Sequence, residues 1–140
     1  MEPYFSPYFA VTELPGVPVL RVVRSPRAFP SLAEMSRAWD ALNRALDRID
    51  RTRFALLMDL RLATGRNDHN FEQTLTPHRR ELQRGFSRTA VLVSSPAGVL
   101  QVHRHAIQDG MQMRAFMEPP KAMDWLLESP IRTALVQPGS

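Results

Sequence analysis

The chain has 140 residues, of which 44% are hydrophobic and 23% are charged, and this size and balance are typical of a single globular domain with one core. It contains no cysteine, which excludes a disulfide framework, a thiolate metal site and a cysteine nucleophile. The net charge of +4 is carried by arginines spread along the chain, with Lys121 as the only lysine, and because nucleic-acid binding needs a clustered basic patch, no specific nucleic-acid partner is predicted.

Two short segments rich in β-branched and aromatic residues come first. Tyr8–Leu14 and Val17–Arg24 are joined at Pro15-Gly16, where proline presets φ and glycine accepts a positive φ. The two segments therefore predict an opening β-hairpin.

The clearest helical pattern follows the hairpin. Ser31 and Glu34 form a capping-box signature, and apolar residues then recur at helical spacing as far as Ile49. Phe54–Leu60 is short and almost continuously apolar, which is typical of a strand covered on both faces by helices. Asp59 is the polar exception near the end of that strand.

A second helix is predicted within Phe71–Arg84, where apolar residues keep one face. Pro77 either begins this helix, with Thr76 as its cap, or kinks it. Ala90–Val93 is apolar and short, so it predicts another buried strand.

The remaining elements are a helix, a strand and a helix. The third helix is expected from a cap at Ser95 to a closing Gly110, with proline in its first turn. Met113–Phe116 predicts a short strand. The last helix begins at Pro119 and is expected to stop at Ser129-Pro130.

This order of elements predicts an α/β fold with a mixed, mostly parallel sheet of about five strands, an opening β-hairpin and about four helices. The whole chain is expected to form one domain with a core of about residues 8–129 and flexible termini at 1–7 and 131–140. No apolar run approaches the roughly 20 residues that span a bilayer, and no signal peptide is recognised. A cytoplasmic location is therefore predicted.

The densest polar stretch is the loop Arg61–His69, directly after the strand that ends at Leu60. Ligands of open α/β sheets bind at the carboxyl ends of strands, so this loop is the candidate site for a partner or ligand. Its candidate contact residues are Asp59, Arg61, Thr64, Gly65, Arg66, Asn67 and Asp68. The alternative is a solvated connection in which Arg61 bridges Asp59 and Asn67-Asp68 form a turn.

No motif indicates a reaction, and no catalytic residue, cofactor or metal site is predicted. His103 and His105 are two apart on a predicted helix and point in different directions, which does not suit a helical metal site. His69 with Asp59 or Asp68 could act as a general base, but no nucleophile or oxyanion signature accompanies them. The glycines are scattered, so no phosphate-binding loop is present.

Three segments carry a resemblance to a known family. They are the strand end Leu56–Arg61 with Asp-Leu-Arg, the helical segment Gly98–Arg104 and the final-helix segment Ala122–Leu126. These segments resemble the STAS fold of SpoIIAA-like anti-sigma-factor antagonists. Together with the order of elements, the resemblance covers Tyr8–Leu127. It implies non-enzymatic work: protein-protein signalling controlled by phosphorylation of a Ser or Thr at the start of the second helix, or binding of nucleotides and lipophilic molecules at that edge.

The candidate phosphosite is Thr64, because it is the hydroxyl-bearing residue of the loop before Phe71. The antagonists carry Asp-Ser before a small residue and glycine, whereas this chain reads Ala-Thr-Gly-Arg-Asn-Asp from residue 63. Thr64 is thus displaced from a clear helix start. Arg61 and Arg66 instead suit an acidic partner or ligand.

The leading hypothesis is a regulatory interaction module whose protein partner is a regulatory kinase or a component of a sigma-factor system. The alternative is a carrier or sensor of a small lipophilic or anionic ligand, held between the sheet and the second and third helices. The third hypothesis is a hydrolase or transferase centred on His69. A homodimer that pairs through a seam at Trp125 also stays open.

Overall fold

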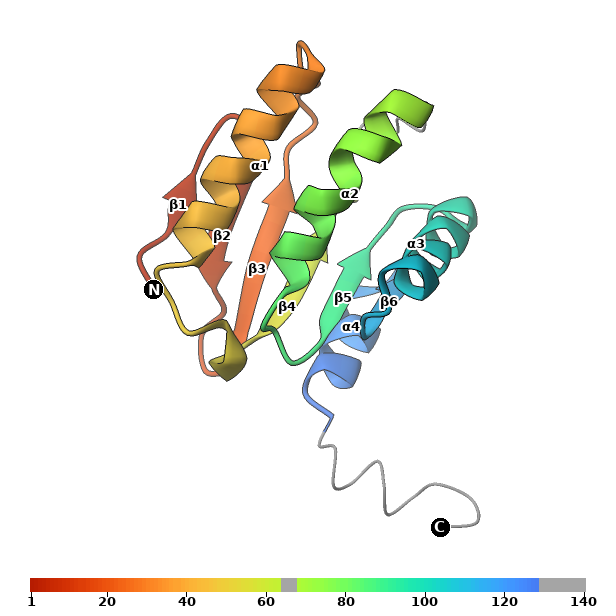
Figure 1. Ribbon diagram of the computed structural model, residues 1–140. Coiled ribbons are helices and arrows are strands. Elements are labelled where there is room, and N and C mark those ends of the chain that lie inside the picture. Colours follow the sequence, from red (N-terminus) through yellow and green to blue (C-terminus); the bar gives the residue numbers. More distant parts are fainter. Residues whose placement is uncertain (64–67, 129–140) are drawn as a thin grey trace.

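The structure, a computed structural model, describes residues 1–63 and 68–128. Within these residues the strands form one six-stranded sheet whose order follows the chain (Figure 1). The strands are β1 (Tyr4–Phe5), β2 (Phe9–Glu13), β3 (Val19–Arg24), β4 (Ala55–Asp59), β5 (Thr89–Leu92) and β6 (Met113–Phe116). The helices are α1 (Leu32–Leu46), α2 (His69–Gln83), α3 (Pro96–Asp109) and α4 (Pro119–Leu126), with a 3-10 turn η1 (Arg51–Arg53).

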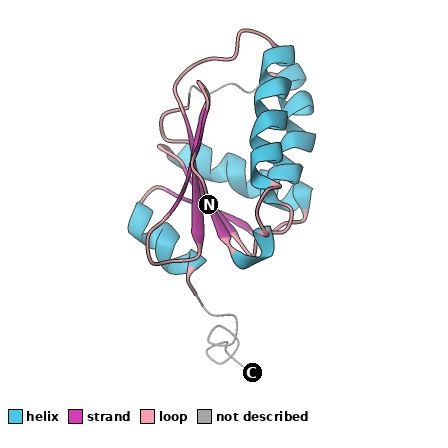
Figure 2. Ribbon diagram, turned by 90° about the vertical axis from the view of Figure 1, so that its left-hand side faces the viewer, coloured by secondary structure: helices cyan, strands magenta, loops and turns pink. Residues whose placement is uncertain are grey.

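The sheet separates two layers of helices. The pairs β1–β2 and β2–β3 are antiparallel, and β3 to β6 run parallel. Helices α1, α2 and α3 pack on one face, and α4 packs on the other (Figure 2). Because side chains alternate along a strand, Leu56 and Met58 of β4 face the three helices while Ala55 and Leu57 face α4. This confirms the predicted mixed, mostly parallel sheet with an opening hairpin and four helices.

Helix α1 begins as its sequence predicts. The Ser31 hydroxyl accepts a hydrogen bond from the backbone N–H of Glu34 at 3.0 Å, which satisfies one of the free donors at a helix N-terminus. Met35, Trp39 and Leu42 are buried against the sheet. The helix ends at Leu46 and does not reach Ile49.

Arg51 in η1 explains why the chain leaves α1 early. Its buried guanidinium donates to the carbonyl oxygens of Asn43 at 3.2 Å and Leu82 at 3.1 Å and to the Asp47 carboxylate at 2.9 Å. These groups lie at the C-terminal ends of α1 and α2, where Asn43 O also accepts from the Asp47 N–H at 3.0 Å. One side chain therefore binds the ends of two helices.

Helix α2 starts earlier than its sequence suggests. Asp68 is its N-cap, with the carboxylate accepting from the N–H of Phe71 at 3.3 Å. Pro77 lies inside the helix, so Thr76 is not a cap. Its hydroxyl instead donates to the carbonyl of Glu72 at 2.8 Å.

The N-terminal segment adds a strand to the sheet. Tyr4 pairs with Val11 and Phe5 pairs with Ala10, which forms β1 on the outer edge of the sheet. The amino group of Met1 also reaches the Glu13 carboxylate at 2.7 Å. The sheet thus has six strands where about five are predicted. The flexibility predicted for residues 1–7 stays a prediction, and residues 131–140 lie outside the described residues.

The last two helices follow their predicted boundaries closely. The Ser95 hydroxyl caps α3 by accepting from the Gly98 N–H at 3.1 Å. Gly110 ends α3 with φ of +63°, a conformation that favours glycine. Helix α4 ends at Leu126, and the predicted stop at Ser129-Pro130 falls outside the described residues.

Candidate functional site

Two of the predicted contact residues, Asp59 and Arg61, bind each other. The Asp59 carboxylate, 3% exposed at the end of β4, accepts from Arg61 Nε at 3.0 Å and Nη2 at 2.8 Å. Arg21 Nη2 of β3 reaches the same carboxylate at 3.0 Å. Burial acts to raise the pKa of Asp59, but the hydrogen bonds from Arg61 and Arg21 outweigh it and lower the pKa to about 2.

This arrangement supports the alternative in which Arg61 bridges Asp59. Arg61 holds the start of the loop against the sheet edge, because its backbone N–H also donates to Asp59 at 3.1 Å. Asp59 is occupied by two guanidinium groups, which leaves it poorly suited to orient His69 as a general base.

The other predicted site residues fall into two groups. Asp68 serves as the N-cap of α2, and His69 is the first residue of that helix. Thr64, Gly65, Arg66 and Asn67 lie outside the described residues, so the candidate phosphosite and most of the predicted contact surface stay predictions.

A further feature that bears on function is a cavity of about 500 Å³ between the sheet and helices α2 and α3. Thr89, Val91 and Val93 line it along one side of β5 and its C-terminal extension. Five residues of a strand span about 13 Å, so the cavity runs along the whole strand. It lies where the second hypothesis, the carrier or sensor of a small ligand, expects a ligand.

The floor of the cavity is apolar. It is formed by side chains of β4, β5, β6 and α3, together with the first residue after β4. These residues are Met58, Leu60, Val91, Val93, Val102 and Met113. Such a lining is typical of pockets for small, mostly apolar molecules.

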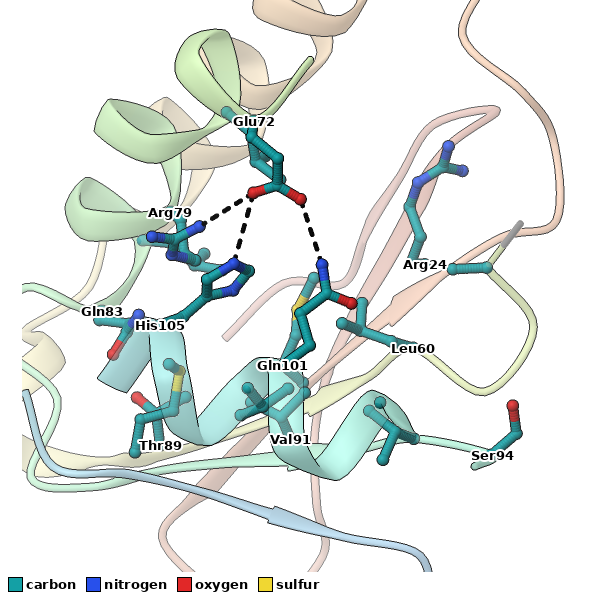
Figure 3. Close-up of a pocket in the computed structure, with 18 of the residues that line it drawn as sticks. Arg24, Leu60, Glu72, Arg79, Gln83, Thr89, Val91, Ser94, Gln101 and His105 are labelled. Carbon is teal, nitrogen blue, oxygen red and sulfur yellow. Dashed lines mark hydrogen bonds and ion pairs between the residues drawn. The ribbon is translucent and has the colours of Figure 1, made fainter. Parts of the chain in front are cut away.

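One wall of the cavity is polar and joins α2 to α3 (Figure 3). The Glu72 carboxylate of α2 accepts from Gln101 Nε2 at 3.2 Å and pairs with His105 Nε2 at 3.3 Å. Burial lowers the pKa of His105, and the charge of Arg79 lowers it further, against the opposing effect of Glu72. The neutral imidazole is thereby favoured beside Glu72.

A second set of polar contacts also joins α2 to α3. Arg79 of α2 donates from Nε at 2.8 Å and from Nη2 at 3.0 Å to the Asp109 carboxylate at the end of α3. Arg80 Nε reaches the same carboxylate at 3.1 Å. The contacts that bridge α2 and α3 are thus polar.

The cavity reaches the carboxyl edge of the parallel strands, where Arg24 at the end of β3 lines it with Leu60 and Ser94. Figure 3 places these three residues toward one end of the cavity and Thr89 toward the other. Arg24 is 7% exposed, and burial lowers the pKa of its guanidinium.

The polar lining residues are absent from the sequence-based prediction. One signal was available: Gln101 and His105 are four apart on α3, and Glu72 and Arg79 are seven apart on α2, so each pair shares a helix face. The sequence-based prediction instead considers the spacing of His103 and His105 on α3. Arg24 carries no signal of its own, because it ends an ordinary strand.

Two further classes of site are not found in the part of the chain that the structure describes. No group of three or more His, Cys, Asp or Glu side chains is arranged to hold a metal ion there. No described helix combines the length and apolar character that a membrane crossing needs.

The comparisons with known proteins bear on the fold. No protein-family model and no curated protein matches the sequence. Among solved structures, the chain is similar to an uncharacterized protein of the DUF3478 family with a SpoIIAA-like fold from Shewanella loihica PV-4. The two share 15% identity with a TM-score of 0.61, over 84% of this chain and 91% of the other. The chain therefore has a SpoIIAA-like fold, as its resemblance to the STAS group predicts.

Proposed function

We propose that this protein is a non-enzymatic, SpoIIAA-like module that binds a small, mostly apolar ligand in the cavity between the sheet and helices α2 and α3. The observation that carries the proposal is the size of the cavity with its apolar floor, about 500 Å³. Interiors of domains are close-packed, with few voids larger than a water molecule, whereas pockets for small molecules measure roughly 300–1,000 Å³. A cavity of this size is therefore expected to hold a ligand.

The way in which α2 and α3 are held apart supports this proposal. Two packed helices normally bury apolar side chains between them, but here Glu72 and Asp109 bridge the helices through polar contacts. These pairs fix the spacing that leaves the cavity beneath them. They also occupy one another, which leaves no activated nucleophile among them and favours binding over catalysis.

Filling the cavity tests the proposal. In Val91→Phe the larger ring is expected to occupy the middle of the cavity and to reduce the amount of small molecule that co-purifies from the host by at least about tenfold, since overlap with a side chain excludes the ligand. Native mass spectrometry and solvent extraction of the protein purified from its own host measure the bound species.

Leu100→Phe is the matched control, because Leu100 is 69% exposed on the outer side of α3. It adds the same ring without touching the cavity, so the bound species is expected to be retained. Thermal unfolding checks that both variants are folded. Equal amounts of ligand in wild type and Val91→Phe, or no bound species in the wild type, would count against the proposal.

A second candidate function is recognition of a protein partner at the start of the loop after β4. The observation that favours it is Leu62, which is 60% exposed directly beside Arg61, whose contact with Asp59 fixes the backbone there. A large apolar side chain that stays exposed next to charged groups can be buried by a protein partner. In this view a kinase or a sigma-factor-system component, as the resemblance implies, is the partner, and the cytoplasm is its compartment.

Replacing Leu62 by serine is expected to reduce partner recovery in an affinity pull-down from the source organism by about tenfold, the effect of losing one interface anchor. Met117→Ser is the control, because Met117 is also an exposed apolar residue but follows β6. If both variants recover the same proteins in the same amounts as wild type, this surface is not the contact.

A further inference from the structure

Arg24 differs from three other arginines of this chain in how its guanidinium is paired. Arg61, Arg79 and Arg84 each present their Nε and Nη2 atoms to a carboxylate, namely that of Asp59, Asp109 and Glu81. This edge of the guanidinium carries two parallel donors that match the two oxygens of a carboxylate. It is the pairing that this fold uses repeatedly.

In Arg24 the same edge of the guanidinium, formed by Nε and Nη2, has no carboxylate partner among the described residues. Its Nη1 donates to the carbonyl oxygen of Ser25 at 2.7 Å, and its guanidinium carbon lies 4.1 Å from the centroid of the Phe29 ring. No described acidic side chain comes within ion-pairing distance of Arg24. Arg24 as a whole residue is 7% exposed, and a largely buried arginine normally has a charged partner.

The position of Arg24 points to a partner inside the cavity. Arg24 lines the end of the cavity at the carboxyl edge of the strands, together with Ser95 and Ala97 at the start of α3. Helix α3 has 14 residues, and the positive end of its dipole favours a negative charge, while Pro96 has no N–H and the Gly98 N–H already donates to Ser95. Two independent groups from different elements therefore favour an anion at this end.

We propose that Arg24 binds the carboxylate of the ligand that occupies the cavity, so that the ligand is an apolar carboxylic acid. This inference rests on the proposed function. The carboxylate lies at the carboxyl edge of β3 and β5, and the apolar part extends along β5 over Val91 toward Thr89.

A single carboxylate fits this end better than a phosphate group. Among the described lining residues the arginines are Arg24 and Arg79, and Arg79 is already paired with Asp109. Glu72 adds a negative charge to the lining. A phosphate monoester with close to two negative charges would lack a second free cation, whereas a carboxylate needs only the one guanidinium edge.

A pair of probes that differ in the head group tests the inference. Decanoate and 1-decanol have the same chain length, and their affinities for the full-length protein are measured by isothermal titration calorimetry at neutral pH. The wild type is expected to bind decanoate at least about tenfold more tightly than 1-decanol, because a charge-assisted, buried pair is lost with the alcohol.

Arg24→Met is expected to weaken decanoate binding by at least about tenfold and to leave 1-decanol binding within about twofold. Arg27→Met is the matched control, because this substitution removes the same charge nearby. Arg27 is exposed and does not line the cavity. It should bind both probes as the wild type does.

Each outcome decides a different point. Equal affinity of the wild type for the two probes, or unchanged decanoate binding in Arg24→Met, overturns the carboxylate inference and leaves the cavity proposal standing. Failure of both probes to bind the wild type, together with a wild-type protein that carries no species from its host, removes the proposed function itself. If Arg24→Met does not fold, the comparison of the two probes on wild type decides alone.

Discussion

Replacing Arg51 by methionine is expected to lower the free energy of unfolding by about 3 kcal/mol or more, since carbonyl groups at the ends of two helices would lose their charge-assisted hydrogen bonds from a buried cation. The buried guanidinium donates to Glu81 O at 2.6 Å, Leu82 O at 3.1 Å and Asn43 O at 3.2 Å. These carbonyls lie at the C-terminal ends of two helices, where a cation is also favoured by the helix dipole. Chemical denaturation followed by circular dichroism measures the change.

Arg48→Met controls for the loss of charge, because Arg48 is exposed just beyond α1. Its effect is expected to stay within about 0.5 kcal/mol, as is usual for exposed positions. Arg51→Lys keeps the charge without the planar fork and should fall between wild type and Arg51→Met. A loss in Arg51→Met no larger than in Arg48→Met would show that Arg51 does not join the two helix ends energetically.

The second large effect concerns acid stability through Asp59. Its pKa is about 2 in the folded protein against an ordinary value of 3.8, so the ionised form is favoured by folding. This contribution, about 2 kcal/mol by the linkage relation, is fully present above the unfolded pKa and is lost as the pH falls through the folded pKa. We therefore expect it to disappear between about pH 5 and pH 1.

The matched variant is Asp59→Asn, which cannot ionise and leaves Arg21 and Arg61 without a carboxylate. It is expected to be less stable than wild type at pH 7 by about 3 kcal/mol, and the difference should shrink as the pH is lowered toward 2. Comparing the two proteins removes the contributions of other carboxylates such as Asp109, whose pKa is also lowered. A stability difference that does not change with pH would contradict this account of Asp59.

The elements that could be predicted from the sequence are those whose own residues carry the signal. Ser31 and Glu34 mark the start of α1, and the apolar run of β4 needs no information from elsewhere. Strand β1 has only two residues, Tyr4 and Phe5, which are strand only because β2 offers its edge. No periodic pattern can show a pairing of that length.

Helix α2 shows how a strong local signal can be outweighed. Pro77 suggests a start or a break because proline removes a helical hydrogen bond. The Asp68 cap and the apolar face that includes Leu75 and Leu82 nevertheless hold the helix from His69 to Gln83. Tertiary burial thus overrides local propensity at this position.

Part of the candidate site could be predicted from the sequence, and part could not. The pairing of Arg61 with Asp59 involves residues two apart in the chain and could be anticipated as one of two alternatives. The cavity depends on the distance between α2 and α3, which no local pattern encodes. Arg24 becomes notable only through what is missing around it, a carboxylate, and that is a property of the folded chain.

The agreement between strand order and chain order has a consequence for how the domain assembles. Every pair of neighbouring strands in this sheet is also consecutive in the chain, so each new strand docks against one that is already in place. Most connections contain one turn or one helix, and the connection from β3 to β4 contains α1 and η1. Pairing only consecutive strands keeps the entropy of chain closure small and the separation between contacting residues low for a parallel sheet. Folding can therefore advance from one edge to the other as the chain is made, with each step adding to a continuous template.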